Sequence, residues 1–93
     1  MKRQRFASVW DALEDTAAEA ANMRARSKLM IALRGKVEAW KVSQTEAARR
    51  LGLTQPRLND LMRGRIDKFS LDALINVAAR AGLSVLLQIR EAA

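Results

Sequence analysis

The sequence lacks the residues on which most disulfide-stabilised, metal-binding or catalytic domains of this size depend. It has no cysteine and no histidine, which excludes disulfides and thiol nucleophiles and removes the commonest metal ligand and general base. No apolar run approaches the roughly 20 residues of a membrane span, and the basic start is not followed by the apolar stretch of a signal peptide. We therefore expect a soluble, cytoplasmic protein that has no metal or cofactor and is not an enzyme.

Proline and aromatic residues are also scarce, and the remaining composition predicts a small helical domain. The 93 residues include one proline and 4% aromatic side chains, against 49% hydrophobic residues. This balance is typical of an all-α domain with a single modest core. The net charge is +7, which favours a polyanionic partner such as DNA, RNA or an acidic protein surface. Residues 41–68 contain seven basic and three acidic residues, so more than half of the excess charge lies there.

The same region carries the pattern of two short helices joined by a tight turn. Ser43 and Glu46 form a capping box that predicts a helix from residue 44 onwards, and Gly52 follows where a left-handed residue would end it. Thr54 then caps a second helix, with proline tolerated in its first turn. Two helices of this length around a short corner are the spacing of a helix-turn-helix unit. The alternative is an ordinary helical hairpin in a small core.

Residues 1–26 are expected to form an N-terminal arm with short amphipathic helices, followed by one domain over residues 27–93. The arm contains large apolar residues at the spacing of one helix face. They either fold back onto the domain or dock on another protein. These candidates for a protein contact are Phe6, Val9, Trp10 and Leu13.

The C-terminal residues change from a helical period to a period of two. Val85, Leu87 and Ile89 alternate with other side chains, and this pattern predicts a β-strand. No partner strand is evident elsewhere in the sequence, so we expect the strand to pair with its own copy across a two-fold axis in a homodimer. The alternative is that residues 83–90 extend a helix or fray.

The second helix of the motif opens on polar side chains suited to DNA. A helix in the major groove reads bases with its first two turns, while helix starts and nearby cations hold phosphates. The side chain of Gln55 suits a bidentate contact with adenine, and that of Arg57 suits one with guanine. The base-reading candidates are Gln55, Arg57, Asn59 and Asp60, and the phosphate candidates are Gln44, Thr45, Thr54, Arg63, Arg65 and Lys68. Arg49 and Arg50 are either further phosphate contacts or solvated helix surface.

Four short runs carry a more specific resemblance. TEAA (45–48), LTQP (53–56), LMRG (61–64) and DKFS (67–70) resemble the Xre/Cro-type helix-turn-helix proteins, particularly the HigA-like antitoxins, over residues 27–90. The resemblance implies a lambda-repressor-like bundle of about five helices. It also implies a dimer that represses its own operon by binding operator DNA and neutralises a RelE/ParE-like (HigB-type) toxin.

The same resemblance assigns two residues and marks two departures. Gln44 matches the family's phosphate-contacting glutamine, and Gln55 matches the first glutamine of the recognition helix. Pro56 stands where a second glutamine is frequent in the family, and Asp60 occupies a later base-reading position. The operator sequences of the family therefore cannot be assigned to this protein. Two other functions remain open. One is a stand-alone or phage-type regulator without a toxin, and the other is a small nuclease using a metal at Asp11, Glu14 and Asp15.

Overall fold

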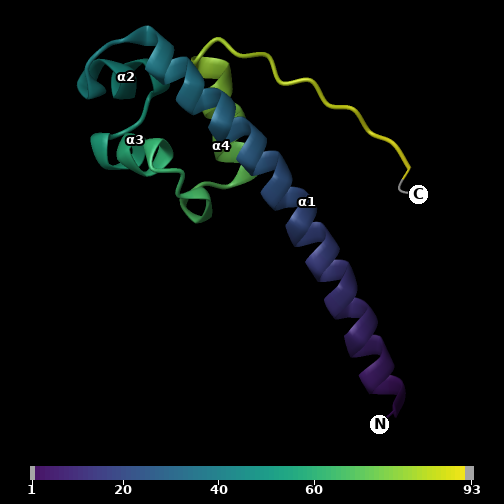
Figure 1. Cartoon of the computed structure of the whole chain (residues 1–93). Helices are drawn as coiled ribbons and strands as arrows, with labels where there is room; N and C mark the ends of the chain where they lie inside the picture. The colour runs from purple at the N-terminus through teal and green to yellow at the C-terminus, as the bar shows by residue number, and fades with distance from the viewer. Residues whose placement is uncertain (1, 92–93) are drawn as a thin grey trace.

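The computed structural model describes residues 2–91 and, among these, the side chains of residues 16–91. Within this part of the chain, four α-helices and one turn of 3-10 helix follow one another without a strand (Figure 1). The elements are α1 (Lys2–Trp40), α2 (Gln44–Leu51), α3 (Gln55–Met62), η1 (Ile66–Lys68) and α4 (Leu71–Arg80). The all-α prediction is confirmed, whereas the expected count of about five helices is not.

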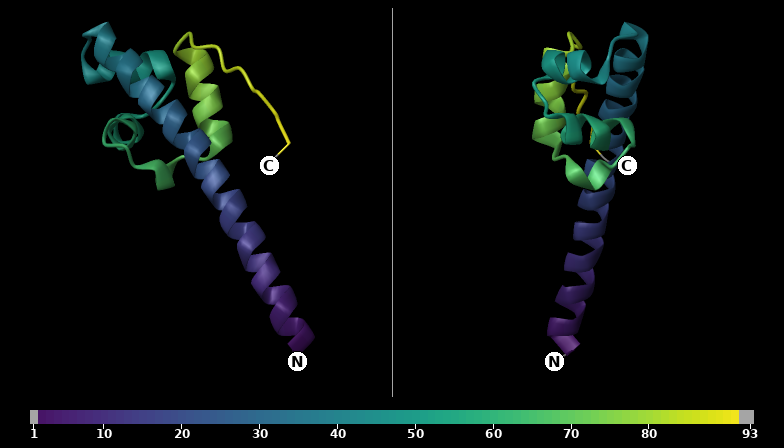
Figure 2. Two further views of the ribbon diagram at one scale, coloured as in Figure 1. Left: turned by 45° about the vertical axis from the view of Figure 1, so that its right-hand side comes forward. Right: turned by 90° about the vertical axis from the view of Figure 1, so that its left-hand side faces the viewer.

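Helix α1 is a single helix of 39 residues in place of several short ones. Its C-terminal half packs against the other helices, and the rest extends away from them (Figures 1 and 2). It passes through residue 26, where we expected the arm to end, without interruption. The sequence offers no proline or glycine before Gly35 to break it, and its alanine-rich middle has high helix propensity. None of the described helices contains a stretch apolar enough to cross a bilayer.

The caps of the shorter helices agree with the sequence. The hydroxyl oxygens of Ser43, Thr54 and Ser70 accept hydrogen bonds from backbone amides at the starts of α2, α3 and α4. Gly52 has a φ of 67°, and its amide donates to carbonyl oxygens near the end of α2. The left-handed turn there favours glycine because other residues are strained at positive φ. These local signals place the corner between α2 and α3 as predicted.

One half of the predicted capping box is absent. The Ser43 hydroxyl accepts from the amide of Glu46, but the Glu46 carboxylate binds two arginines instead of returning to the amide of Ser43. A carboxylate gains more from charged donors three and four residues along the same helix than from one neutral amide.

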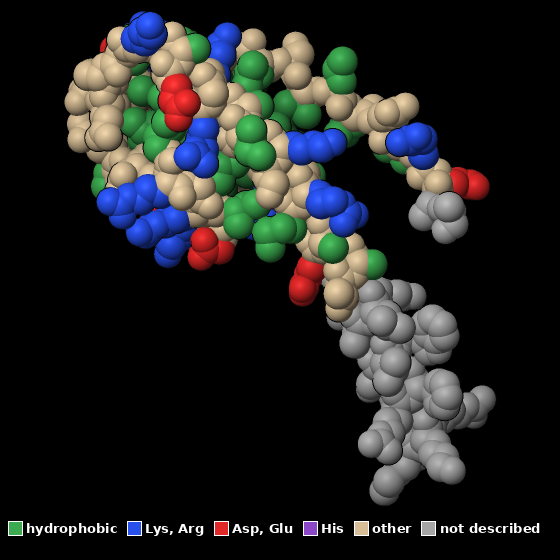
Figure 3. All heavy atoms as spheres, viewed as in Figure 1, with side chains coloured by type: hydrophobic (Ala, Val, Ile, Leu, Met, Phe, Trp, Pro, Cys, Tyr) green, Lys and Arg blue, Asp and Glu red, His purple; other side chains and the backbone are tan. Residues whose placement is uncertain are grey.

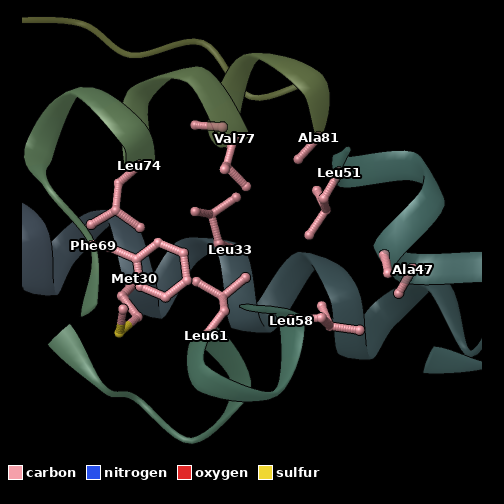
Figure 4. Packing of buried hydrophobic residues seen from close by; sticks show 12 residues of the cluster. Met30, Leu33, Ala47, Leu51, Leu58, Leu61, Phe69, Leu74, Val77 and Ala81 are labelled. Carbon is pink, nitrogen blue, oxygen red and sulfur yellow. The ribbon is translucent and has the colours of Figure 1, made fainter. Parts of the chain in front are cut away.

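The core lies where α1 crosses the other three helices. Leu33 of α1 and Leu74 of α4 are completely buried, together with Leu58 and Leu61 of α3 (Figure 4). Phe69, in the connection before α4, is 2% exposed, and its ring lies beside Met30 and Leu74 at one end of the core (Figure 4). Burying each of these side chains contributes roughly 1.5–3 kcal/mol. The core therefore fixes the orientation of α3 relative to α1.

The C-terminal residues do not form the predicted strand. After α4, residues 84–91 are extended without regular secondary structure and run on the side of α1 and α4 away from α2 and α3 (Figure 1). A strand needs a hydrogen-bonding partner, and none of the described helices offers an open backbone edge. The alternation is also imperfect, since the intervening Leu86 is as apolar as its neighbours and 92% exposed.

Candidate nucleic-acid interface

The starts of α2 and α3 meet at one exposed surface. The side-chain amide of Gln55, the first residue of α3, donates a hydrogen bond of 2.8 Å to the hydroxyl oxygen of Thr45 in the first turn of α2. Both side chains are exposed. Each helix start presents the positive end of a backbone dipole. This surface therefore combines polar side chains with partial positive charge, which suits a polyanion.

The four base-reading candidates divide into two pairs. Gln55 and Asn59 are exposed, whereas Arg57 and Asp60 are half-buried. The guanidinium of Arg57 lies 4.3 Å from the centre of the Phe69 ring, and its Nη1 donates to the Lys68 carbonyl oxygen at 2.7 Å. Asp60 forms an ion pair of 3.6 Å with Arg65. Gln55 and Asn59 are therefore the two candidates whose side chains are open to solvent, whereas Arg57 and Asp60 are half-buried and each has a partner within the protein.

The phosphate candidates lie around α3. Gln44, Thr45 and Thr54 are exposed at the helix starts, and the two threonine hydroxyls each retain a hydrogen to donate while accepting a bond from the protein. Lysine and arginine side chains gather beside α3 and η1 at the lower left of Figure 3. The exposed cations that follow α3 are Arg63, Arg65 and Lys68. The structure thus brings amide, hydroxyl and cationic donors to one region.

Arg49 and Arg50 are engaged with the surface of α2. The Glu46 carboxylate accepts from Arg49 Nε at 2.9 Å and from Arg50 Nε at 3.1 Å. The hydrogen bonds from Arg49 and then Arg50 lower the pKa of Glu46 to about 2. The Arg50 guanidinium also lies 5.0 Å from the Trp40 ring centre. These contacts favour solvated helix surface over phosphate binding for both arginines.

Two residues beside this surface were missed by the sequence analysis. Arg26 of α1 donates from Nη1 to the carbonyl oxygens of Ile66, at 3.0 Å, and Phe69, at 3.4 Å. Its position four residues before the buried Met30 places it on the core-facing side of α1, which is the signal that could have identified it. Phe69 belongs to the DKFS run, but no role was assigned to its ring.

The other sequence-based candidates lie elsewhere. Val85, Leu87 and Ile89 are in the C-terminal segment, with 37%, 81% and 90% of their surfaces exposed. The arm residues Phe6, Val9, Trp10 and Leu13 lie outside the residues whose side chains are described, as do Asp11, Glu14 and Asp15.

Comparisons with known proteins give two similarities. A family model described as a helix-turn-helix domain matches residues 12–90. A solved structure described as an XRE-family transcriptional regulator is 27% identical in sequence and superimposes with a TM-score of 0.72. The match covers 80% of this chain and 83% of that one. A search of curated proteins finds no match.

Proposed function

The chain belongs to the helix-turn-helix domain family and has the fold of an Xre-type DNA-binding transcriptional regulator, and from this premise we propose that it is a sequence-specific repressor acting as an antitoxin. Such regulators are typically not enzymes. The proposed protein binds its own operator and neutralises a RelE/ParE-like (HigB-type) toxin. The alternative is an Xre-type regulator, stand-alone or phage-derived, that has no toxin partner.

The proposal that the protein binds DNA is supported above all by the exposed start of α3. With one amide hydrogen of Gln55 held by Thr45, the other amide hydrogen and the carbonyl oxygen remain for a base. This donor and acceptor pair matches the N7 and N6 groups of adenine in the major groove. Asn59 lies one turn further along α3 and is exposed, so it would meet a neighbouring base pair.

The surrounding donors would hold the DNA backbone. Gln44, Thr45 and Thr54 occupy the starts of α2 and α3, where amides and hydroxyls suit phosphate oxygens. The exposed cations Arg63, Arg65 and Lys68 follow the end of α3 in the chain. Because Arg65 is paired with Asp60, it would contribute less to a phosphate contact than Lys68.

We propose that the repressor is a homodimer joined through its C-terminal segments. Between this segment, α1 and α4 lies an open hollow of about 690 Å³, lined by apolar side chains that include Leu29, Ile75 and Val85. Leu87, which also lines this hollow, and Ile89 are exposed. A second copy of the segment would supply further apolar side chains for the hollow. Two copies of α3 would then read half-sites about 34 Å apart.

The antitoxin part rests on the resemblance of residues 27–90 to HigA-like proteins and on the extension of α1 beyond the bundle. A helix that leaves the globular part can offer an apolar stripe to a partner protein. The proposed toxin-contacting residues are Phe6, Val9, Trp10 and Leu13.

Two experiments test these parts separately. Repeated selection from a random-sequence duplex library should yield one pseudo-palindromic sequence, and failure to enrich any sequence would contradict the repressor proposal. Co-expression with the adjacent reading frame, followed by pull-down, should recover a toxin with the full chain but not with a chain lacking residues 1–15, which keeps the Arg26 contacts to the connection before α4. A chain that binds operator but captures no neighbouring gene product would favour the regulator without a toxin.

A further inference from the structure

Two arginines from different helices hold the connection between α3 and α4. Arg57 of α3 donates to the Lys68 carbonyl oxygen at 2.7 Å. Arg26 of α1 donates to the carbonyl oxygens of Ile66 and Phe69 at 3.0 and 3.4 Å. Three carbonyl groups within four residues are thus bound by guanidinium groups, and hydrogen bonds from charged donors are stronger than those from neutral ones.

The connection has little regular structure of its own to hold it in place. Its one helical turn, η1, spans three residues, and Arg65 at its start makes no side-chain cap. Its internal hydrogen bonds, from Lys68 to Arg65 and from Phe69 to Ile66, measure 3.1 and 3.3 Å. A single 3-10 turn is short and has poor hydrogen-bond geometry. The position of its backbone therefore depends on the two arginines and on the buried Phe69 ring.

Arg57 uses one face of its guanidinium and its Nη1 group within the protein. The face lies over the Phe69 ring, 4.3 Å from its centre, and Nη1 donates to Lys68. Bidentate reading of guanine needs the same planar fork directed into the groove. Arg57 would have to abandon both contacts to reach a base, whereas Gln55 and Asn59 are already exposed.

We propose that Arg57 is a positioning residue of the DNA interface, which acts by fixing Lys68 beside α3, and not a base-reading residue. This proposal rests on the proposed DNA-binding function. The Lys68 side chain is exposed, and its own carbonyl group is the acceptor for Arg57. Since that hydrogen bond fixes the backbone of Lys68 relative to the recognition helix, it sets where the ammonium group can meet a phosphate.

A double-mutant cycle tests the dependence of Lys68 on Arg57, using the duplex selected by the wild-type protein. Arg57→Ala and Lys68→Ala should each weaken binding about fivefold to tenfold, and the double variant should lose little more than the larger single effect. Lys68→Ala retains the main-chain carbonyl, so it removes only the cation. If the double variant instead shows the product of the two single fold-losses in affinity, Arg57 acts independently of Lys68, and the proposal is overturned.

Arg63→Ala supplies the matched control, because Arg63 is also an exposed cation near the end of α3 but makes none of the contacts to η1 described above. When Arg63→Ala is combined with Lys68→Ala, the two fold-losses in DNA affinity should multiply. The second readout is base preference, measured over all single substitutions of the selected duplex. Arg57→Ala should leave the wild-type profile unchanged, and loss of preference at one base pair would identify Arg57 as a base reader after all.

Folding is checked by thermal unfolding of each variant. Should Arg57→Ala not fold, Arg57→Lys serves instead, because lysine can donate to Lys68 but lacks the planar face that covers Phe69. It should weaken binding about twofold without changing base preference, and a changed preference would overturn the proposal. If the wild-type chain selects no sequence at all, the DNA-binding function itself fails before any variant is compared.

Discussion

The amide of Gln55 donates a hydrogen bond to the hydroxyl of Thr45, 2.8 Å away, and this contact joins the first turns of α2 and α3. Helix α2 thereby restrains the rotatable Gln55 side chain at the start of α3, the proposed recognition helix. A side chain that is already restrained loses less conformational entropy when it binds a base. The Thr45 hydroxyl is therefore expected to influence specificity without touching a base.

Replacing Thr45 by valine should relax specificity at the base pair read by Gln55. The substitution retains the branched shape and removes the acceptor, so affinity for the selected duplex should fall by about 1 kcal/mol, or about fivefold. Affinity for a scrambled duplex should fall less, because there the substitution removes only the phosphate contact of the hydroxyl. Thr45→Ser, which keeps the hydroxyl, is the control and should behave as the wild type in the same titrations. Equal losses on both duplexes would show that Thr45 contacts phosphate and does not orient Gln55.

Lys68→Ala should weaken binding to all duplexes alike. Each phosphate contact removed lowers the slope of log affinity against log salt by about 0.9, so titrations across a range of salt concentrations measure the effect. Lys28 of α1, which lines the hollow by the C-terminal segment, provides a matched control on another face. Lys28→Ala, compared at a protein concentration at which light scattering gives the same oligomeric state for variant and wild type, should leave the slope unchanged. An unchanged slope for the Lys68 variant would remove Lys68 from the interface.

The sequence predicted the motif well because its signals are local. Ser43, Thr54 and Ser70 cap the helices that follow them, and Gly52 ends α2, all within a few residues of the groups they bind. The exposure of Gln55 follows from similar reasoning about spacing, because Leu58 and Leu61 form the buried face of α3.

The errors concern contacts made over longer separations. Arg57 binds a carbonyl 11 residues away, and Arg26 binds one 40 residues away, so neither contact has a sequence pattern. The strand prediction for residues 84–90 failed because alternation describes side chains, whereas a strand also needs a backbone partner. The prediction of separate N-terminal helices was wrong, because a capping signal that could start a helix does not by itself end the helix that precedes it.

Gly35→Ala should stabilise the protein. Gly35 lies within α1, and a Cβ atom added there would meet nothing within 4 Å. The glycine is therefore not needed to make room for another part of the described chain. Alanine should therefore raise the free energy of unfolding by about 0.5–1 kcal/mol, measured by urea denaturation. Gly52→Ala is the contrasting control and should destabilise, because Gly52 has a φ of 67° and the new Cβ would lie 2.6 Å from Arg80 Nε.

Acidification should remove a stabilising contribution of Glu46. Its pKa is lowered from the ordinary value of 4.5 to about 2 by Arg49 and Arg50. A carboxylate with a lowered folded-state pKa stabilises the fold above its ordinary pKa, and this contribution is lost as the pH falls from 4.5 to about 2. The effect should be small and sensitive to salt, because the pairs are exposed.

Glu46→Gln isolates this contribution. Stability of the wild type and the variant should differ above the ordinary carboxyl pKa and converge near the folded-state pKa, as followed by thermal unfolding over that range at low ionic strength. A difference that persists unchanged at the lowest pH would assign the effect of the substitution to something other than the charge of Glu46.

A charge placed in the C-terminal segment should dissociate the proposed dimer. In an extended segment, alternate residues point to the same side, so Val85, Leu87 and Ile89 would together face the second copy. Leu87, which is 81% exposed in the single chain, is the central residue of the three. Burying a carboxylate there without a partner is strongly unfavourable. Leu87→Asp should therefore yield a monomer by light scattering, while the fold, judged by thermal unfolding, is retained.

Ala79→Glu is the matched control, because it introduces the same charge at an exposed residue of α4 that does not line the hollow. It should leave the dimer intact. The monomeric Leu87→Asp variant should also bind the pseudo-palindromic duplex more weakly than the wild type, since each half-site must then be occupied independently. A Leu87→Asp protein that remains dimeric would mean that the two copies meet through another surface, and the exposed apolar residues of the segment would then have to serve a different contact.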